Sequence, residues 1–496
     1  MNALRRSDLP FATLLCIALL IAASAVPLLA ASHLAHPIDD TYITMVYARS
    51  IAQGRGFTFG LNDHPTLGTT TPFNTLILAA LYALFPQADA AGVAVALSVI
   101  CWIATSWLWF LGGGILGLNR LERLFIALLV LIETTTWIAH LGMETWLFVF
   151  LLTLCVMAYF RGALVLTGVL IGLLFLTRGE GILLAPLIGL HLLSQRRGWL
   201  RRGLRIALGG AIVLLPWFVY AALTFGSIFP STLAAKSAQV DLGFTQPFVI
   251  YMAYVFVGEW SNLGFVVVTP WLLLFVGGLV YAIRARRKLL LLPAWALLFV
   301  VGYGILRIPT YKWYALPVMY VVTVFAGLAL AGIAPLVVRL AKSLKPERTQ
   351  QVGLIAACAA LALIAAIILP KNIPNSPVGD WRHDVYHNLA EWLDSNTPPE
   401  SSVAYVEIGL LGWYGQRRVV DLLGLTNPEL IPAVKQGDFE RAIEIAQPDV
   451  LICDSRFAWA CKTIPDGYTQ IKTFTGAELD GTPDIAQDQF VIYEKR

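Results

Sequence analysis

The sequence predicts an α-helical membrane protein that crosses the bilayer many times and ends in a small α/β domain. Hydrophobic residues make up 58% of the 496 residues, charged residues only 13%, and the mean hydropathy is +0.71. Long apolar runs recur through the first three quarters of the chain, and the composition changes after Pro370. One soluble core cannot bury so much apolar sequence, so these observations exclude an ordinary soluble enzyme.

A bilayer crossing needs about 20 apolar residues, and the backbone must satisfy its own hydrogen bonds there, which favours helices. The first run follows Arg5 and Arg6 and lacks a small-residue cleavage pattern at its end, so we expect an uncleaved anchor with a cytoplasmic N-terminus. We predict about eleven spans by this length criterion, at roughly 11–31, 91–118, 123–140, 145–160, 163–177, 180–195, 204–224, 263–283, 289–306, 315–340 and 351–370.

The apolar segment 73–86 is too short for a crossing and begins at a proline. We interpret it as an interfacial helix within an external loop over 32–90. With this choice the basic loops fall on the cytoplasmic side, as the positive-inside rule requires; these loops are 120–123, 196–205, 284–288 and 339–348. The net charge of +4 therefore reflects membrane topology, and no nucleic-acid partner is expected.

The same topology sends five polar, aromatic or glycine-rich segments to the outer face, where they would gather around a cavity. They are the Asp39-Asp40 loop and the segments 136–145, 177–181, 225–236 and 307–314.

The residues from 371 to 496 alternate apolar strand-like runs with helix-like segments, which predicts an extracytoplasmic α/β domain. Strands are expected at 401–409, 417–424, 448–454 and 489–495, and helices at 383–396 and 439–447. Cys453 and Cys461 lie close together in this domain, where a disulfide is chemically permitted but sequence spacing does not decide it.

The adjacent carboxylates Asp39 and Asp40 stand just after the first span. Carboxylates at the surface of a bilayer are a candidate site for a base that acts on a lipid-linked substrate. The competing interpretation is that one or both cap the helix that begins near Thr41, because Asp is favoured there and offsets the helix dipole.

Several segments in order resemble GT-C type polytopic glycosyltransferases, and most closely the actinobacterial arabinofuranosyltransferases that complete cell-wall arabinan. The resemblance is carried by IDDTYITMVYARSIAQGRGFTF, TTPFNTLILAALY, GMET at 142–145, LTRGEGILL at 176–184, FGSIFPSTLAAK at 225–236 and EIGLLGWYGQRRVVDLLGLTNP at 407–428. Two positions depart from the family pattern, since Gly179 replaces a proline and Ser231 an asparagine. The donor sugar is therefore not readable from the sequence.

The resemblance implies an inverting transfer of a sugar from a polyprenyl-phosphate carrier to a glycan or lipid hydroxyl at the outer face of the cytoplasmic membrane. Asp39 is the catalytic base that the family implies. Asp40 orients the acceptor, holds a divalent cation such as Mg²⁺ or Mn²⁺ together with Asp39, or is itself the base. No cofactor is required by this chemistry, because cationic side chains can neutralise the phosphate.

Lys236 and Arg178 are the predicted partners of that phosphate, although basic residues at helix ends also snorkel to water. Glu144 and Glu180 either accept hydrogen bonds from sugar hydroxyls or pair with Arg178. Trp313 and Tyr314 offer flat faces for a sugar ring, and an aromatic belt at the interface explains them equally well. A transporter or flippase of a lipid-linked sugar and a glycan-binding scaffold are the rival functions.

Overall fold

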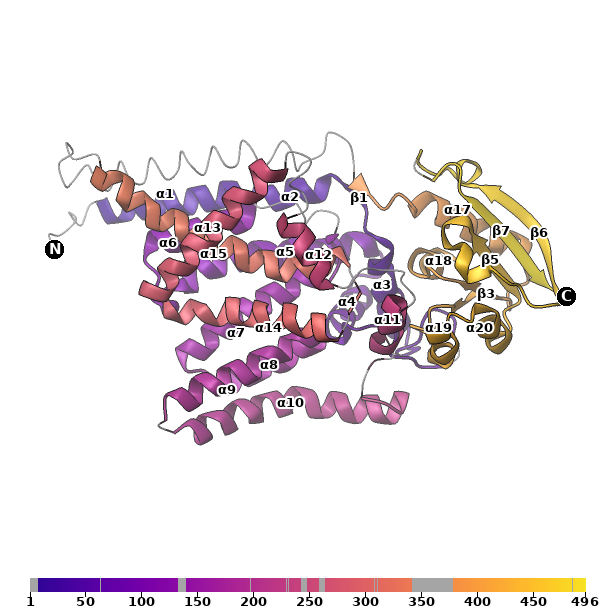
Figure 1. The fold of residues 1–496 in the computed structure, drawn as a ribbon, viewed down its shortest axis with the longest axis horizontal. Coiled ribbons are helices and arrows are strands. Elements are labelled where there is room, and N and C mark those ends of the chain that lie inside the picture. The colour runs from indigo at the N-terminus through magenta and orange to yellow at the C-terminus, as the bar shows by residue number, and fades with distance from the viewer. Residues whose placement is uncertain are drawn as a thin grey trace.

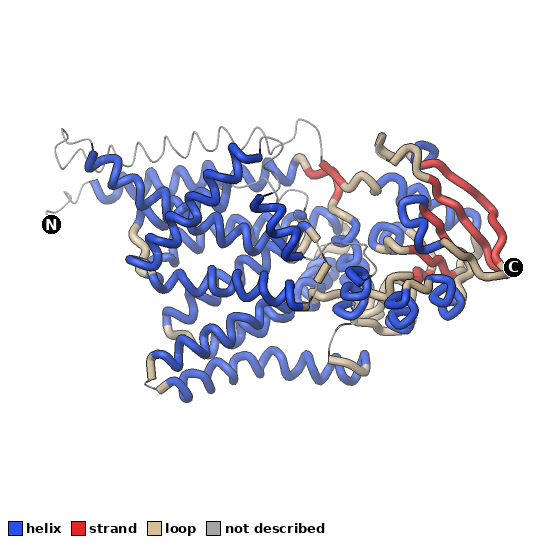
Figure 2. The backbone as a smooth tube through the Cα atoms, viewed as in Figure 1, coloured by secondary structure: helices blue, strands red, loops and turns tan. Residues whose placement is uncertain are grey.

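The computed structural model describes residues 8–62, 64–132, 140–196, 198–228, 230, 232–241, 248–257, 264–306, 308–309, 311–340, 378–483 and 485–496. Long helices pack side by side over most of the length of the molecule, and a domain with a β-sheet lies at the opposite end from the N-terminus (Figure 1). Figure 2 shows that the strands are concentrated in that domain, with a short strand pair at the junction. The predicted span 351–370 lies outside the described residues.

The helices of the N-terminal part follow the predicted apolar runs. They are α1 Asp8–Ala23, α2 Ala25–Ser32, α3 Asp39–Ala52, α4 Pro72–Leu84, α5 Ala90–Gly112, α6 Arg120–Ile132, α7 Thr145–Arg161, α8 Leu164–Thr177, α9 Leu184–Ser194, α10 Trp199–Phe225, α11 Thr232–Asp241, α12 Phe248–Val257, α13 Gly264–Ala285, α14 Leu291–Ile305 and α15 Lys312–Leu340, with short 3₁₀ turns η1 Gly113–Leu116, η3 Gly179–Leu183 and η5 Arg287–Leu290.

Among the described residues, five helical stretches are long and apolar enough to cross a membrane: Thr13–Ser32, Ala90–Leu116, Trp199–Phe225, Arg287–Ile305 and Lys312–Ile333. Other apolar helices are shorter, and α4, at 13 residues, is one of these. At 1.5 Å per residue α4 is about 20 Å long, which is less than a hydrocarbon core of about 30 Å. The interfacial placement of 73–86 stays a prediction.

Small residues let two of these helices pack closely. A Cβ atom on Gly168 of α8 would lie 1.9 Å from the carbonyl oxygen of Ile206 in α10, and one on Gly209 would lie 2.0 Å from that of Val165. Apolar side chains on α10 such as Leu223 point outward, and Leu223 is 83% exposed. A helix held by glycines on one face and apolar on the other suits a lipid environment, where close van der Waals packing drives helix association.

The C-terminal part is an α/β unit, as predicted. Its strands are β3 Ser402–Tyr405, β4 Arg418–Asp421, β5 Val450–Asp454, β6 Tyr468–Thr475 and β7 Gln489–Lys495, and its helices are α17 His383–Asn396, α18 Gly409–Tyr414, α19 Ile431–Gln436 and α20 Phe439–Ala446, with 3₁₀ turns η6 Pro428–Leu430, η7 Ser455–Cys461 and η8 Gly476–Leu479. The sheet order is β4-β3-β5-β7-β6. Strand β3 pairs in parallel with β4 and β5, whereas β7 runs antiparallel to β5 and β6.

Covalent and backbone links tie this unit together and to the helices. Cys453 and Cys461 form a disulfide between β5 and η7, which settles the pairing that the sequence left open. Strand β1 Leu34–His36, after the first apolar helices, pairs in parallel with β2 Val378–Gly379. The start of the segment 32–90 is thereby fixed to the start of the C-terminal unit.

Candidate functional site

Asp39 joins the external loop to the C-terminal sheet unit. Its buried carboxylate accepts hydrogen bonds from the backbone N–H groups of Gly409 (3.2 Å) and Leu410 (2.7 Å), at the start of α18. Its own backbone N–H donates to Asp380 Oδ2 at 2.7 Å. A Cβ atom on Gly409 would lie 2.0 Å from the carbonyl oxygen of Asp39, so the contact requires glycine there. Asp39 therefore acts as a link between two parts of the chain.

Arg382 completes the charge pattern on this side. It donates to Asp380 Oδ2 at 2.6 Å and forms an ion pair with Glu407. Burial raises the pKa of Asp39 to about 8, while the positive charge of Arg382 works in the opposite direction. The sequence analysis missed this cluster because no motif surrounds Arg382. The one available signal was Glu407, a carboxylate near the end of the predicted strand 401–409.

Asp40, next in α3, is oriented differently. It is partly exposed, and no donor within the described ranges hydrogen-bonds to its carboxylate. Burial raises the pKa of Asp40, and the nearby positive charge of Lys236 is the largest influence that lowers it. The carboxylate of Asp40 therefore has no hydrogen bond from a described residue and is influenced by the charge of Lys236.

Lys236, in α11, is held against an aromatic wall. Its Nζ donates to the Tyr314 hydroxyl at 2.8 Å and lies 5.1 Å from the ring centroid of Tyr311. The Tyr311 hydroxyl donates to Gln239 Oε1 at 2.6 Å, and Trp313 stacks on the Tyr311 ring with centroids 4.6 Å apart. Burial favours the neutral amine, yet Tyr314 and Asp40 outweigh it and raise the pKa of Lys236. Lys236 therefore remains a cation.

Arg178 forms a closed ion cluster with the two predicted glutamates. Arg178 Nη1 lies 2.8 Å from Glu144 Oε1, and Arg178 Nε lies 2.5 Å from Glu180 Oε1. The Tyr303 hydroxyl donates to Glu180 Oε2 at 3.1 Å, and the guanidinium lies 5.0 Å from the ring centroid of Tyr314. All three charged side chains are buried. Of the two alternatives stated for the glutamates, the geometry has them pair with Arg178.

The turn that carries Glu144 lies directly against the start of α3. Gly142 has φ +97°, and its N–H donates to Ser98 Oγ at 3.0 Å. A Cβ atom on Gly142 would lie 3.0 Å from Thr41 Cγ2. The left-handed backbone and the close approach both favour glycine, so the sequence GMET serves to bring this turn beside the Asp pair.

The predicted residues thus divide into two groups. Lys236 and Arg178 each contact Tyr314. Glu144 and Glu180 join this group through Arg178, and Trp313 joins it through Tyr311, whose ring lies near Lys236. Burial raises the pKa of Asp40 and the positive charge of Lys236 lowers it, whereas the carboxylate of Asp39 is hydrogen-bonded to the start of α18. Ser231 lies outside the described residues.

The oxygens of Asp39 accept hydrogen bonds from backbone N–H groups, and among the described residues Asp39 and Asp40 belong to no group of three candidate metal ligands. A group that could hold an ion lies instead at the junction of the two units. It consists of His36, His383 and Asp384, with candidate ligand atoms within 4.8 Å of one another.

Several solved structures share this fold. The Archaeoglobus fulgidus oligosaccharyltransferase in its apo form aligns with a TM-score of 0.60 and 14% identity, over 94% of this chain and 74% of that chain. ArnT from Cupriavidus metallidurans bound to undecaprenyl phosphate aligns with a TM-score of 0.56 and 16% identity, over 96% of this chain and 97% of that chain. The arabinofuranosyltransferase AftD from Mycobacteria aligns with a TM-score of 0.55 and 17% identity, over all of this chain and 40% of that chain.

This chain has the GT-C fold of those membrane enzymes. The likeness extends to oligosaccharyltransferases and ArnT as well as AftD, so it does not single out an arabinofuranosyltransferase. Residues 378–493 match the model of a domain of unknown function, DUF8728. No curated protein matches the chain by sequence.

Proposed function

We propose that the protein is an inverting glycosyltransferase. It moves a sugar from a polyprenyl-phosphate carrier to a hydroxyl of a glycan or lipid acceptor at the outer face of the cytoplasmic membrane. The observation that carries this proposal is Asp40, which has no hydrogen-bond donor among the described residues and whose pKa is raised by burial and lowered by the charge of Lys236. The site lies where apolar helices meet the C-terminal unit, as an enzyme of lipid-linked substrates requires (Figure 1).

The reaction assigns one task to each charge. Asp40 accepts the proton of the acceptor hydroxyl as its oxygen attacks the anomeric carbon of the sugar. The bond from that carbon to the phosphate oxygen breaks, and the electron pair leaves with the carrier phosphate. Lys236 stabilises the negative charge that develops on the phosphate. Attack opposite to the leaving group inverts the configuration.

The fold relatives support the choice of a lipid phosphate carrier. One ArnT structure is bound to undecaprenyl phosphate, and an Archaeoglobus fulgidus relative is in complex with an inhibitory peptide and a dolichol-phosphate. For this chain we propose a polyprenyl-phosphate sugar as donor. Arg178 is proposed as a framework residue that holds Tyr314, because both of its ionic partners are within the protein.

The test is sugar transfer by purified protein in nanodiscs with a panel of polyprenyl-phosphate sugars. Asp40→Asn should reduce the transfer rate by about 10²- to 10⁴-fold, the usual contribution of a positioned base. The control is Asp466→Asn, which changes an exposed carboxylate of the C-terminal unit and should leave the rate unchanged.

Three other results would redirect the proposal. Loss with Asp39→Asn but not with Asp40→Asn would make Asp39 the base, as the family resemblance implies. Loss of transfer after chelation, with recovery on adding Mg²⁺ or Mn²⁺, would show that the reaction needs a divalent cation. Movement of the donor across the bilayer without transfer by any variant would favour a flippase.

A further inference from the structure

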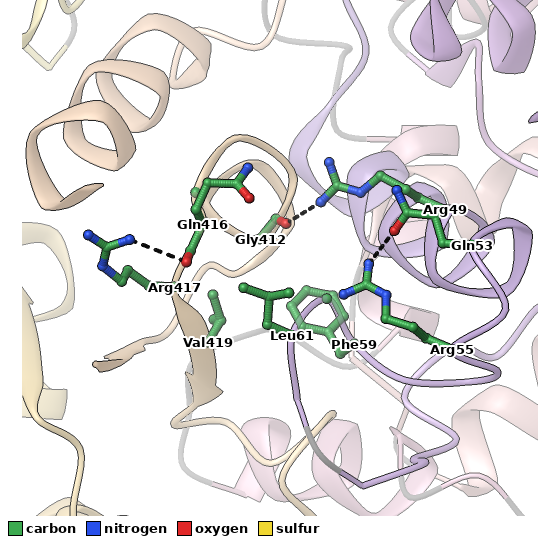
Figure 3. A pocket seen from close by; sticks show the side chains of 11 residues that line it. Arg49, Gln53, Arg55, Phe59, Leu61, Gly412, Gln416, Arg417 and Val419 are labelled. Atoms are coloured by element: carbon green, nitrogen blue, oxygen red, sulfur yellow. Dashed lines mark hydrogen bonds between the residues drawn. The ribbon is translucent and has the colours of Figure 1, made fainter. Parts of the chain in front are cut away.

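A polar cavity lies at the other end of α3 from the Asp pair. It has a volume of about 180 Å³ and lies between the loop that follows α3 and the α18–β4 segment of the C-terminal unit (Figure 3). Arg49, Gln53 and Arg55 line it from one side, and Gln416 and Arg417 from the other. The cavity is thus built from the two segments, 38–59 and 407–428, that were singled out in the sequence.

The charge of this cavity is unbalanced. Among the described residues, its lining includes three arginines and no Asp or Glu. Arg417 is paired with Asp394 at 3.2 Å, but neither Arg49 nor Arg55 forms an ion pair with a described residue. Burial and the charge of Arg55 both lower the pKa of Arg49, which shows that the two cations are close enough to repel.

Arg49 is fixed in place, whereas Arg55 retains free donors. Arg49 donates to the backbone oxygens of Trp413 (2.8 Å) and Gly412 (2.9 Å), and its guanidinium lies 4.3 Å from the Trp413 ring centroid. The side chain of Arg55 makes one hydrogen bond to a described residue, from Nη2 to Gln53 Oε1 at 2.6 Å (Figure 3). A guanidinium presents five N–H groups in a planar fork that matches carboxylate and phosphate oxygens. The pair is therefore pre-organised for an oxyanion.

We propose that this cavity binds the carboxylate or phosphate of an acidic saccharide acceptor. The acceptor role rests on the proposed glycosyl transfer. Arg49 follows Asp40 by nine residues on one helix, which places it about 14 Å along the axis and about half a turn around the axis from the proposed base, at 1.5 Å and 100° per residue. An acidic oligosaccharide anchored there by its charge would extend around α3 and reach the base with a hydroxyl several sugar units from the anchored group.

The lining favours a water-borne ligand over a lipid headgroup. Every residue that lines the cavity comes from α3 and its following loop or from the C-terminal unit, and the long apolar helices contribute none. Within the described part of the molecule, the cavity is therefore separated from the surfaces that face the hydrocarbon core.

The experiment measures anion binding to the full-length protein in phosphatidylcholine nanodiscs by calorimetry, with glucuronate and inorganic phosphate as probes and glucose as the neutral control. We expect saturable binding of both anions, none of glucose, and weakening by salt. Arg55→Gln should weaken binding by about tenfold or more, because it removes a charge-assisted hydrogen bond. Arg441→Gln, an exposed arginine paired with Glu444 at 2.8 Å, should change it less than twofold as a matched control by the usual weakness of surface ion pairs.

The outcomes separate this inference from the proposed function. Asp40→Asn should abolish transfer and leave anion binding intact. Absence of saturable anion binding, or equal binding by Arg55→Gln, would overturn the inference while leaving the transferase proposal untouched. Displacement of glucuronate by phosphatidylglycerol in the nanodisc, lost in Arg55→Gln, would assign the cavity to a lipid headgroup and overturn the acceptor site. Anion binding without transfer from any donor would remove the acceptor role together with the proposed function.

Discussion

Arg178 and Lys236 are two cations that contact the same residue, Tyr314, and their surroundings differ. Arg178 is 4% exposed and bonded to two carboxylates, whereas Lys236 is partly exposed and bonded to the Tyr314 hydroxyl. Asp40 faces Lys236 without a hydrogen bond. A buried charge whose countercharges lie within the protein does not need a ligand to balance it. The partners of each cation therefore distinguish a structural role for Arg178 from a catalytic role for Lys236 better than the residue type does.

The largest expected effect is on stability, at Arg178. Arg178→Gln would leave the carboxylates of Glu144 and Glu180 buried without a counter-charge, and breaking a buried pair in this way costs about 3–5 kcal/mol. Thermal unfolding of the protein in detergent should show a large fall in Tm. Glu144→Gln is the matched variant, because it leaves one carboxylate paired with one guanidinium. Its fall in Tm should be smaller than that of Arg178→Gln. An Arg178→Gln protein of normal stability but impaired donor binding would contradict the framework role.

The next effect is on catalysis, at Lys236. Lys236→Met keeps the length of the side chain and removes the charge that stabilises the leaving phosphate. The transfer rate should fall by about 10²- to 10³-fold, as when one preorganised donor is removed from a developing charge. Tm should be nearly unchanged, in contrast to Arg178→Gln. The assay is single-turnover transfer with donor in excess, and a loss of Tm without a loss of rate would reverse the comparison.

A smaller effect is expected at the contact of Asp39 with α18. Gly409→Ala places a Cβ atom 2.0 Å from the Asp39 carbonyl oxygen, and overpacking of this kind costs about 1–3 kcal/mol. Limited proteolysis should release the C-terminal unit faster from this variant than from wild type. Gly203→Ala in α10 is the control, because a Cβ atom there meets nothing within 4 Å. Unchanged proteolysis of Gly409→Ala would show that α18 does not depend on this approach.

Much of the helical framework could be predicted because the bilayer imposes a length on apolar segments. The break between α1 and α2 could not, since it depends on Ser24, whose Oγ donates to the Leu20 carbonyl oxygen at 2.7 Å. The helices α11 and α12 were also missed, because each has only 10 residues and lies within a segment interpreted as a loop. Strand β6 was missed because the apolar residues of YTQIKTFT recur at every third position, and this spacing lacks the two-residue alternation that predicts a half-buried strand.

The site shows a similar division. Membrane topology sufficed to place Glu144, Arg178 and Lys236 at one face, because each stands at the end of an apolar run. It did not separate the roles of Asp39 and Asp40, since the partner of Asp39 lies 370 positions away at Gly409. Neighbouring residues on a helix point in directions about 100° apart, and only the tertiary contacts decide which of them faces the site.

The smallest expected effect is a shift in pH dependence, and it links the two charges that face each other. A general base acts in its ionised form, and burial raises the pKa of Asp40 above the ordinary 3.8, so transfer should rise with pH through an acid limb above that value. Lys236 lowers this pKa by favouring the carboxylate. Removing the cation in Lys236→Met should therefore move the acid limb of the residual activity to higher pH. A limb that stays in place would mean that Asp40 and Lys236 are not coupled, and that the titrating base lies elsewhere.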